Sequence, residues 1–214
     1  QNRSLEVLEY NKKVFNYFNI PVNYVKFPFP NISHGWALDY FLQTTLNLPI
    51  DYYVFFEQDS IPLKKEFIDI LYDKIKDKQT IFGSSQTAHH KDKNHIYCAP
   101  NFLCFSKELY INLGKPTLND YLPDSDTAQN LTREAEKQGY NICLIYPKHC
   151  ELTTKEEQLE SNNPEYWTLG NSNELKFGLS TNYGDLIFHG FMGNLKRSQD
   201  NFINKCKEIL KENN

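Results

Sequence analysis

The sequence lacks the features that mark membrane, nucleic-acid-binding and disulfide-stabilised proteins. No apolar run approaches the roughly 18 residues that span a bilayer, so no transmembrane segment is predicted. The formal net charge is -4, and no basic field indicates nucleic acid or an anionic membrane as a partner. The five cysteines match no zinc or Cys-x-x-Cys spacing, which favours free thiols in a reducing compartment and predicts a cytoplasmic location.

Repeats, low-complexity tracts and long linkers are also missing, so the chain reads as one folding unit. Its 214 residues are 40% hydrophobic, which is enough for one sizeable core, or for a core with a small subdomain. We therefore expect residues 1–214 to form a single catalytic domain, alone or as part of a longer polypeptide.

The first half of the chain alternates between helical and strand patterns. Ser4 and Ser33 each precede an apolar stripe with helical spacing and are the expected N-caps. The expected elements are a helix over 4–18, a strand over 21–27, a helix over 33–48, a strand over 52–56, a helix over 64–75 and a strand over 80–83. Such an order predicts a mostly parallel sheet with helices packed on it.

The second half is less regular. Gly139 is the expected end of a helix, and the polar stretch 151–180 reads as a long loop of the kind that is usually functional or disordered. The expected elements are strands over 95–105, 141–146 and 185–188 and helices over 106–113, 124–138 and 199–211.

The most informative segment is a strand pattern that ends in two carboxylates. Tyr52–Phe56 is wholly apolar or aromatic, as in a strand covered on both faces. Glu57 and Asp59 follow two residues apart, so a continuing strand would point both to one face, where they could hold a hard cation. The alternative is that these carboxylates only solvate the end of a strand.

The run Tyr53–Leu63 (YVFFEQDSIPL) resembles the metal-binding strand of nucleotide-sugar-dependent glycosyltransferases of the GT-A fold, which ends in Asp-x-Asp. Glu57 replaces the first Asp and Asp59 keeps the second. The resemblance implies an α/β fold, a Rossmann-like three-layer α/β/α arrangement with a central, mostly parallel sheet. It also implies that Asp59 binds Mn²⁺ or Mg²⁺, and that Glu57 contacts the metal or the ribose of the donor.

A second segment near the C-terminus supports this resemblance. His189, Gly193 and Lys196 are spaced like the His, Gly and Lys of some GT-A transferases, with one extra residue between His and Gly. The resemblance implies that His189 completes the metal shell, that Gly193 admits the diphosphate and that Lys196, with Arg197, neutralises it. A lone His beside an apolar strand is otherwise more often structural.

The helix over 33–48 opens with a segment that lies near the nucleotide in the family. His34 or Asp39 could contact the base or ribose, and the alternative is a capped amphipathic helix. Residues 83–90 face the sugars in the family, which makes Gln86, His89 and His90 candidate hydroxyl contacts. Solvated loop histidines are the favoured reading of His89 and His90.

Two further acids, Asp124 and Asp126, precede the helix expected to end at Gly139. In inverting members of the family an acid here deprotonates the acceptor hydroxyl, and the spacing favours Asp126. The alternative is that both acids cap the helix and complement its dipole.

The sequence therefore predicts a hexosyltransferase-like enzyme that moves sugar from a nucleotide diphosphate sugar, such as a UDP-sugar, to a hydroxyl of a glycan or glycoconjugate. The His189 segment favours a retaining reaction and the Asp126 context an inverting one, and both stay open. One alternative is a nucleotidyltransferase, although the Gly-rich basic loop typical of that class is not seen. Another is a non-catalytic sugar- or nucleotide-binding domain, which Glu57 and the lack of the family's first strand permit.

Overall fold

The computed structural model describes residues 4–27, 32–88, 92–120, 124–172, 174–191 and 194–211. These residues form two compact units, and each unit joins segments that are far apart in the sequence. The first unit holds the described residues up to Asn23, then Phe56–Ile68, then those from Tyr146 onward. The second unit holds the described residues of Tyr24–Phe55 and Asp69–Ile145.

The first unit is built on a small antiparallel sheet with the strand order β2-β10-β9-β6. A separate antiparallel pair, β7 with β8, lies in the same unit. Its elements are α1 (Leu5–Tyr17), β2 (Ser60–Pro62), β6 (Pro147–Cys150), α6 (Lys155–Ser161), β7 (Trp167–Thr168), β8 (Lys176–Phe177), β9 (Thr181–Tyr183), β10 (Ile187–His189) and α7 (Lys196–Lys211).

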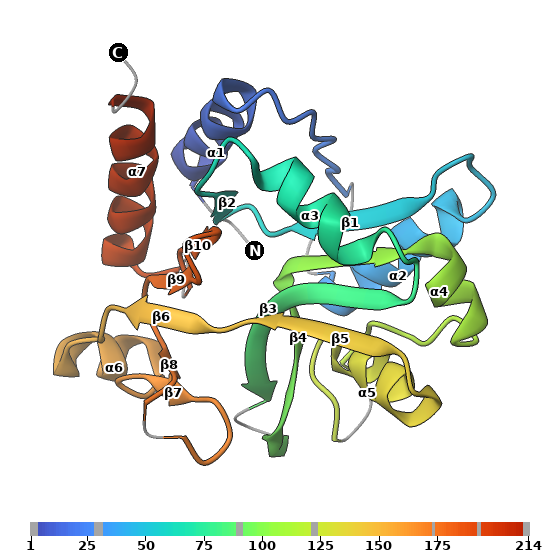
Figure 1. Cartoon of the computed structure of the whole chain (residues 1–214). Helices are drawn as coiled ribbons and strands as arrows, with labels where there is room; N and C mark the ends of the chain where they lie inside the picture. Colours follow the sequence, from blue (N-terminus) through green and yellow to red (C-terminus); the bar gives the residue numbers. More distant parts are fainter. Residues whose placement is uncertain are drawn as a thin grey trace. The chain divides into compact units, whose positions relative to one another are not determined.

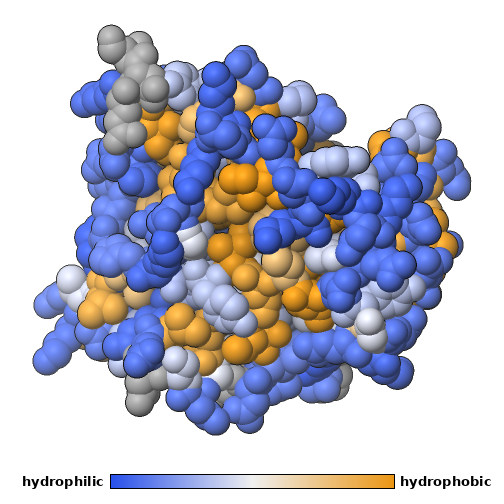
Figure 2. Space-filling view, in the orientation of Figure 1, coloured by the Kyte–Doolittle hydropathy of each residue, from blue (hydrophilic) through white to orange (hydrophobic). Residues whose placement is uncertain are grey.

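Helices α1 and α7 pack against each other, although they come from opposite ends of the chain (Figure 1). Helix α1 begins where Ser4 Oγ accepts a hydrogen bond from the backbone N–H of Glu6, which is the cap that the sequence predicts. Helix α7 buries Phe202, Ile203, Cys206 and Ile209. Hydrophilic side chains cover the face of α7 at the left of Figure 2, so this helix is amphipathic.

The second unit is built on a four-stranded sheet with the order β1-β4-β3-β5. Its apolar core joins α2, α4 and α5 to this sheet through side chains such as Leu42, Tyr53, Phe105 and Leu131. Its elements are α2 (His34–Thr45), β1 (Tyr52–Phe56), β3 (Thr80–Ala88), β4 (Asp92–Ser106), α4 (Lys107–Asn112), α5 (Gln129–Gln138) and β5 (Asn141–Ile145), while α3 (Phe67–Ile75) and the last residue of β1 extend across the boundary between the units.

The predicted three-layer α/β/α fold with a central, mostly parallel sheet is wrong. The described residues form small sheets that are mostly antiparallel, and β3 with β5 is a parallel pair among them. One reason is local: only residues 89–91 separate β3 from β4, and so short a connection requires an antiparallel pair. Another is that β2 pairs with β10, more than 100 residues away.

The local predictions met mixed outcomes. The helices capped by Ser4 and Ser33 are confirmed as α1 and α2, and Gly139 ends α5 with a positive φ of 74°. The strand expected over 21–27 is absent from the described residues there, and the 151–180 stretch contains α6, β7 and β8 rather than only loop. Strand β1 is not covered on both faces, because Val54 is 42% exposed. It also lies at the end of the strand order of its sheet.

In the described part of the chain, no helix combines the length and the apolar character needed to cross a membrane.

Candidate functional site

The two carboxylates of the predicted motif lie in a tight turn of the first unit. Strand β1 ends at Phe56, and residues 57–59 reverse into β2. The backbone N–H of Ser60 closes the turn by donating to the carbonyl of Glu57 at 3.0 Å. The strand therefore does not continue through Glu57 and Asp59 as expected, and the turn, not strand alternation, orients them.

The last residue of β10, His189, lies opposite the start of β2. The antiparallel register pairs His189 with Ser60. Beyond this pair, the backbone N–H of Gly190 donates to the carbonyl of Asp59 at 2.8 Å. A Cβ at Gly190 would lie 3.2 Å from Cβ of Phe202, which is tight, so glycine suits this close approach. The β2–β10 pairing thus brings two segments about 130 residues apart to one place.

Glu57, Asp59 and His189 form a compact cluster there. His189 Nε2 lies 3.1 Å from Glu57 Oε2 and 3.7 Å from Asp59 Oδ1. One ligand atom from each residue can be chosen so that all three lie within 4.8 Å of one another. Asp59 and His189 are buried, and the side chain of Glu57 is 14% exposed. The sequence predicted these three residues as a group, and the structure brings them together.

The two carboxylates of this cluster determine the protonation of the imidazole. Burial by itself lowers the pKa of His189, but hydrogen bonding and charge from Asp59 and Glu57 outweigh it and raise the pKa to about 9. This shift favours the protonated imidazole between the two carboxylates. Two buried carboxylates need a positive charge nearby, and either a proton on the imidazole or a bound metal ion can supply it.

The donor set and spacing fit a divalent cation such as Mn²⁺ or Mg²⁺. Hard cations prefer carboxylate oxygens, and Mn²⁺ also accepts an imidazole nitrogen. Ligands about 2.2 Å from an octahedral ion lie about 3 Å from their neighbours and about 4.4 Å from the opposite ligand, close to the separations in the cluster. His189 Nδ1 is buried without a hydrogen-bond partner among the described residues. The orientation of the imidazole is therefore set on its Nε2 side, which faces the carboxylates of Glu57 and Asp59.

Aromatic side chains of the same unit surround the imidazole. The ring of Phe191 meets that of His189 edge-on at 5.5 Å, and the ring of Trp167 meets Phe191 at 4.8 Å. Phe177 stacks on Trp167. These rings exclude water from one side of His189, and a low local dielectric strengthens its interactions with charged groups.

A further contact to the carboxylate turn comes from Asn11 of α1, a residue for which no functional role was predicted. Its amide Nδ2 donates to the carbonyls of Gln58 at 3.0 Å and Ser60 at 2.9 Å. Asn11 is buried on the helix face that also carries Val7 and Val14. An Asn at a core-facing position of an otherwise apolar stripe is the sequence signal that could have identified it.

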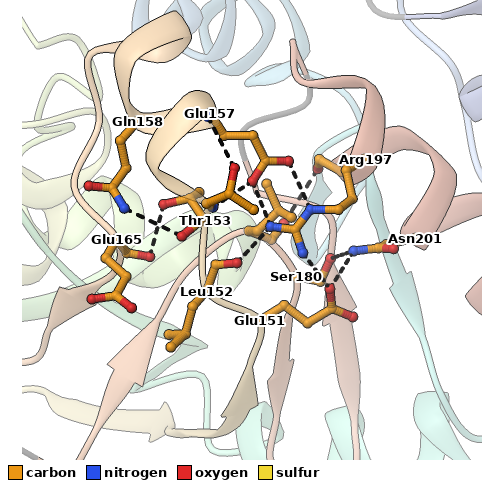
Figure 3. A network of polar contacts seen from close by, with 12 residues as sticks. Glu151, Leu152, Thr153, Glu157, Gln158, Glu165, Ser180, Arg197 and Asn201 are labelled. Atoms are coloured by element: carbon orange, nitrogen blue, oxygen red, sulfur yellow. Dashed lines mark hydrogen bonds and ion pairs between the residues drawn. The ribbon is translucent and has the colours of Figure 1, made fainter.

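The residues predicted to bind diphosphate lie at the start of α7. Lys196 is 76% exposed and forms an ion pair with Asp200 one turn along the helix. The guanidinium of Arg197 is bound to Glu157 through Nε at 2.8 Å and Nη2 at 2.6 Å (Figure 3). Gly193 lies outside the described residues. Of this segment, Lys196 presents an accessible cation, while Arg197 is held within the unit.

The candidate nucleotide contacts on α2 belong to the second unit. His34 is exposed at the start of the helix. The carboxylate of Asp39 accepts hydrogen bonds from the Thr117 hydroxyl at 2.5 Å and the Leu118 backbone N–H at 2.6 Å. Asp39 therefore ties α2 to the segment that follows α4.

The candidate base Asp126 also belongs to the second unit. Its Oδ2 accepts from the Tyr97 hydroxyl at 3.1 Å, and its Oδ1 accepts from the Thr127 backbone N–H at 2.8 Å. Asp124 forms an ion pair with Arg133 at 3.3 Å. Helix α5 begins at Gln129, so the helix expected from residue 124 starts later, and neither acid caps it.

The loop candidates after Gly83 are only partly described. Gln86 lies buried in β3, opposite Tyr97 of β4. His89 and His90 lie outside the described residues. Strand β3 runs to Ala88, beyond the end at Gly83 that the sequence predicts.

Compared with known proteins, the chain matches no family model, no curated protein and no solved structure.

Proposed function

We propose that this chain is a metal-dependent glycosyltransferase that moves a sugar from a nucleotide diphosphate sugar to a hydroxyl group of a glycan or glycoconjugate. The observation that carries the proposal is the convergence of Glu57, Asp59 and His189 in one buried cluster. Two short segments of the sequence resemble this class of enzyme, and each supplies part of that cluster. The proposal rests on these segments and their geometry, not on a GT-A fold.

In this proposal the chain's residues divide the work of holding the donor. Glu57, Asp59 and His189 would hold Mn²⁺ or Mg²⁺. The ion, when bound, neutralises negative charge that develops on the leaving diphosphate. Lys196, exposed at the start of its helix, would add a second cation for the same diphosphate.

The proposed donor site is built from residues of the first unit, whereas Asp126 belongs to the second unit, so the proposal assigns no general base for the acceptor hydroxyl.

A cytoplasmic or other reducing setting is part of the proposal. All five cysteines are free thiols. Burial raises the pKa of Cys206 to about 12, which keeps this thiol protonated and unreactive.

The test is release of nucleoside diphosphate from a panel of nucleotide sugars, with and without Mn²⁺. We expect turnover or slow hydrolysis of one donor that requires the metal, and loss of that activity in Asp59→Asn. The exposed Asp69 on α3 offers a matched control, because Asp69→Asn makes the same chemical change away from the cluster.

The products separate the alternatives. A nucleotidyltransferase would form or consume pyrophosphate instead of releasing a nucleoside diphosphate. A non-catalytic domain would bind the nucleotide sugar without turnover. Absence of metal-dependent binding to every donor tested would sink the proposal.

A further inference from the structure

A buried asparagine in α1 requires an explanation. Asn11 is 2% exposed, and its neighbours on the same helix face, Val7, Val14 and Phe15, are apolar core residues. Asn is a weaker helix former than most residues, and burying its amide costs free energy unless hydrogen bonds replace those to water. An apolar residue would serve simple helix packing better at this position.

Two hydrogen bonds of the Asn11 side chain reach the carboxylate turn. Its Nδ2 donates to the carbonyls of Gln58 and Ser60, which flank Asp59 in the sequence. An amide NH₂ group has two hydrogens, so one group holds both carbonyls at once. Because both partners are acceptors, the NH₂ rather than the amide oxygen must face the turn.

Other contacts hold the rest of this turn. The carbonyl of Asp59 accepts from the N–H of Gly190, and the carbonyl of Glu57 accepts from the N–H of Ser60. The Gln58 side chain donates to the carbonyl of Ser4, just before α1. The backbone on either side of Asp59 is thus held by Asn11, and the carbonyl of Asp59 itself by Gly190, the residue after β10.

From this arrangement we propose that Asn11 is a positioning residue for the cation site, setting the direction of the Glu57 and Asp59 carboxylates by bracing the turn that carries them. The inference rests on the proposed function, because it needs the cluster to bind a divalent ion. It adds a role for α1, a helix that supplies no ligand. Groups that orient metal ligands typically change metal affinity 10- to 100-fold when they are removed.

The experiment is a titration of the full chain with Mn²⁺ alone, in which binding is measured as the loss of the EPR signal of free Mn²⁺. Asn11→Ala removes the brace, and we expect its dissociation constant to rise about 10- to 100-fold. Asn16 is the matched control, since it is exposed on the same helix and Asn16→Ala is the same change. We expect Asn16→Ala to bind Mn²⁺ within about twofold of wild type.

A second variant guards against misfolding. Asn11→Ser is smaller and keeps one donor, so we expect intermediate affinity, and it replaces Asn11→Ala if that protein does not fold. Urea unfolding in the same buffer gives the fraction of each variant that is folded, and each dissociation constant is corrected for this fraction. A role in packing alone would lower the unfolding midpoint but leave the corrected constant unchanged.

The outcomes separate this inference from the proposed function. Wild-type affinity in folded Asn11 variants, with binding lost in Asp59→Asn, overturns the role of Asn11 and leaves the cation site in place. No Mn²⁺ binding by the wild-type chain, or unchanged binding by Asp59→Asn, overturns the site and the role of Asn11 together.

Discussion

The ion pair between Glu157 and Arg197 joins α6 to the start of α7, and it gives a quantitative prediction. Arg197 Nε and Nη2 bind the two carboxylate oxygens of Glu157 at 2.8 and 2.6 Å (Figure 3). Arg197 also donates to the carbonyl of Leu152. The replacement Glu157→Gln removes the charge but keeps a side chain that can complete the capping box with Thr154.

The expected loss of stability follows from the pKa of Glu157. The hydrogen bond from Arg197 is the main cause that lowers this pKa from 4.5 to about 2. At about 1.4 kcal/mol per pH unit, the difference corresponds to roughly 3 kcal/mol. Arg197 is 36% exposed, so water screens the pair, and we expect Glu157→Gln to lower the free energy of unfolding by about 1–2 kcal/mol at pH 7.

The pH dependence has a defined sign. Because the pKa is lower in the folded chain, the stabilisation is complete above pH 4.5 and is lost as the pH falls towards 2. More than half of it should be gone by about pH 3. The difference between wild type and Glu157→Gln should therefore shrink over this range.

Urea unfolding at pH 7, 5, 4 and 3, followed by circular dichroism, measures this difference. The exposed Glu160 on the same helix supplies the control, and Glu160→Gln should change stability little at any of these pH values. An equal difference between wild type and Glu157→Gln at pH 7 and pH 3 would refute the reasoning, as would an effect no larger than that of Glu160→Gln.

Two further predictions concern the second unit and the thiols. Gly35→Ala should lower the free energy of unfolding by about 1–3 kcal/mol in urea melts, because the alanine Cβ would lie 2.5 Å from Cα of Asn119. The higher helix propensity of alanine should not compensate for this clash. A variant as stable as wild type, or more stable, would contradict this packing. Cys98 and Cys206 should resist alkylation in the native chain and react in urea, because burial raises the pKa of both thiols. Mass spectrometry measures the labelling, and rapid labelling of either thiol in the native chain would contradict its burial.

Local signals predicted the helices better than the sheets. The caps at Ser4 and Ser33 are confirmed because a cap depends on a hydroxyl and a few neighbouring N–H groups. The start of α5 was misplaced, since Asp124 resembles a cap, but the helix begins only after Ala128, which has a positive φ of 66°. The parallel sheet was wrong because strand pairing depends on contacts between distant segments, which an α-β-α-β order does not define.

For the candidate site, the sequence identified the candidate ligand residues but not what orients them. Glu57, Asp59 and His189 were predicted from motif spacing, and their clustering agrees with that expectation. Arg197 was predicted to share the diphosphate charge, yet Glu157 binds it, and nothing local in the sequence joins two residues 40 positions apart. Asn11 gave no motif signal, because its partners are backbone carbonyls of another segment.

The sequence by itself determined which residues are candidate cation ligands and where the capped helices begin, because side-chain type and capping are properties of a few adjacent residues. Only the tertiary structure decided that a turn rather than a strand presents Glu57 and Asp59, and that His189 reaches them. The physical reason is the antiparallel pairing of β2 with β10, braced by α1. These interactions join segments about 50 and 130 residues apart, and a linear pattern does not encode their partners.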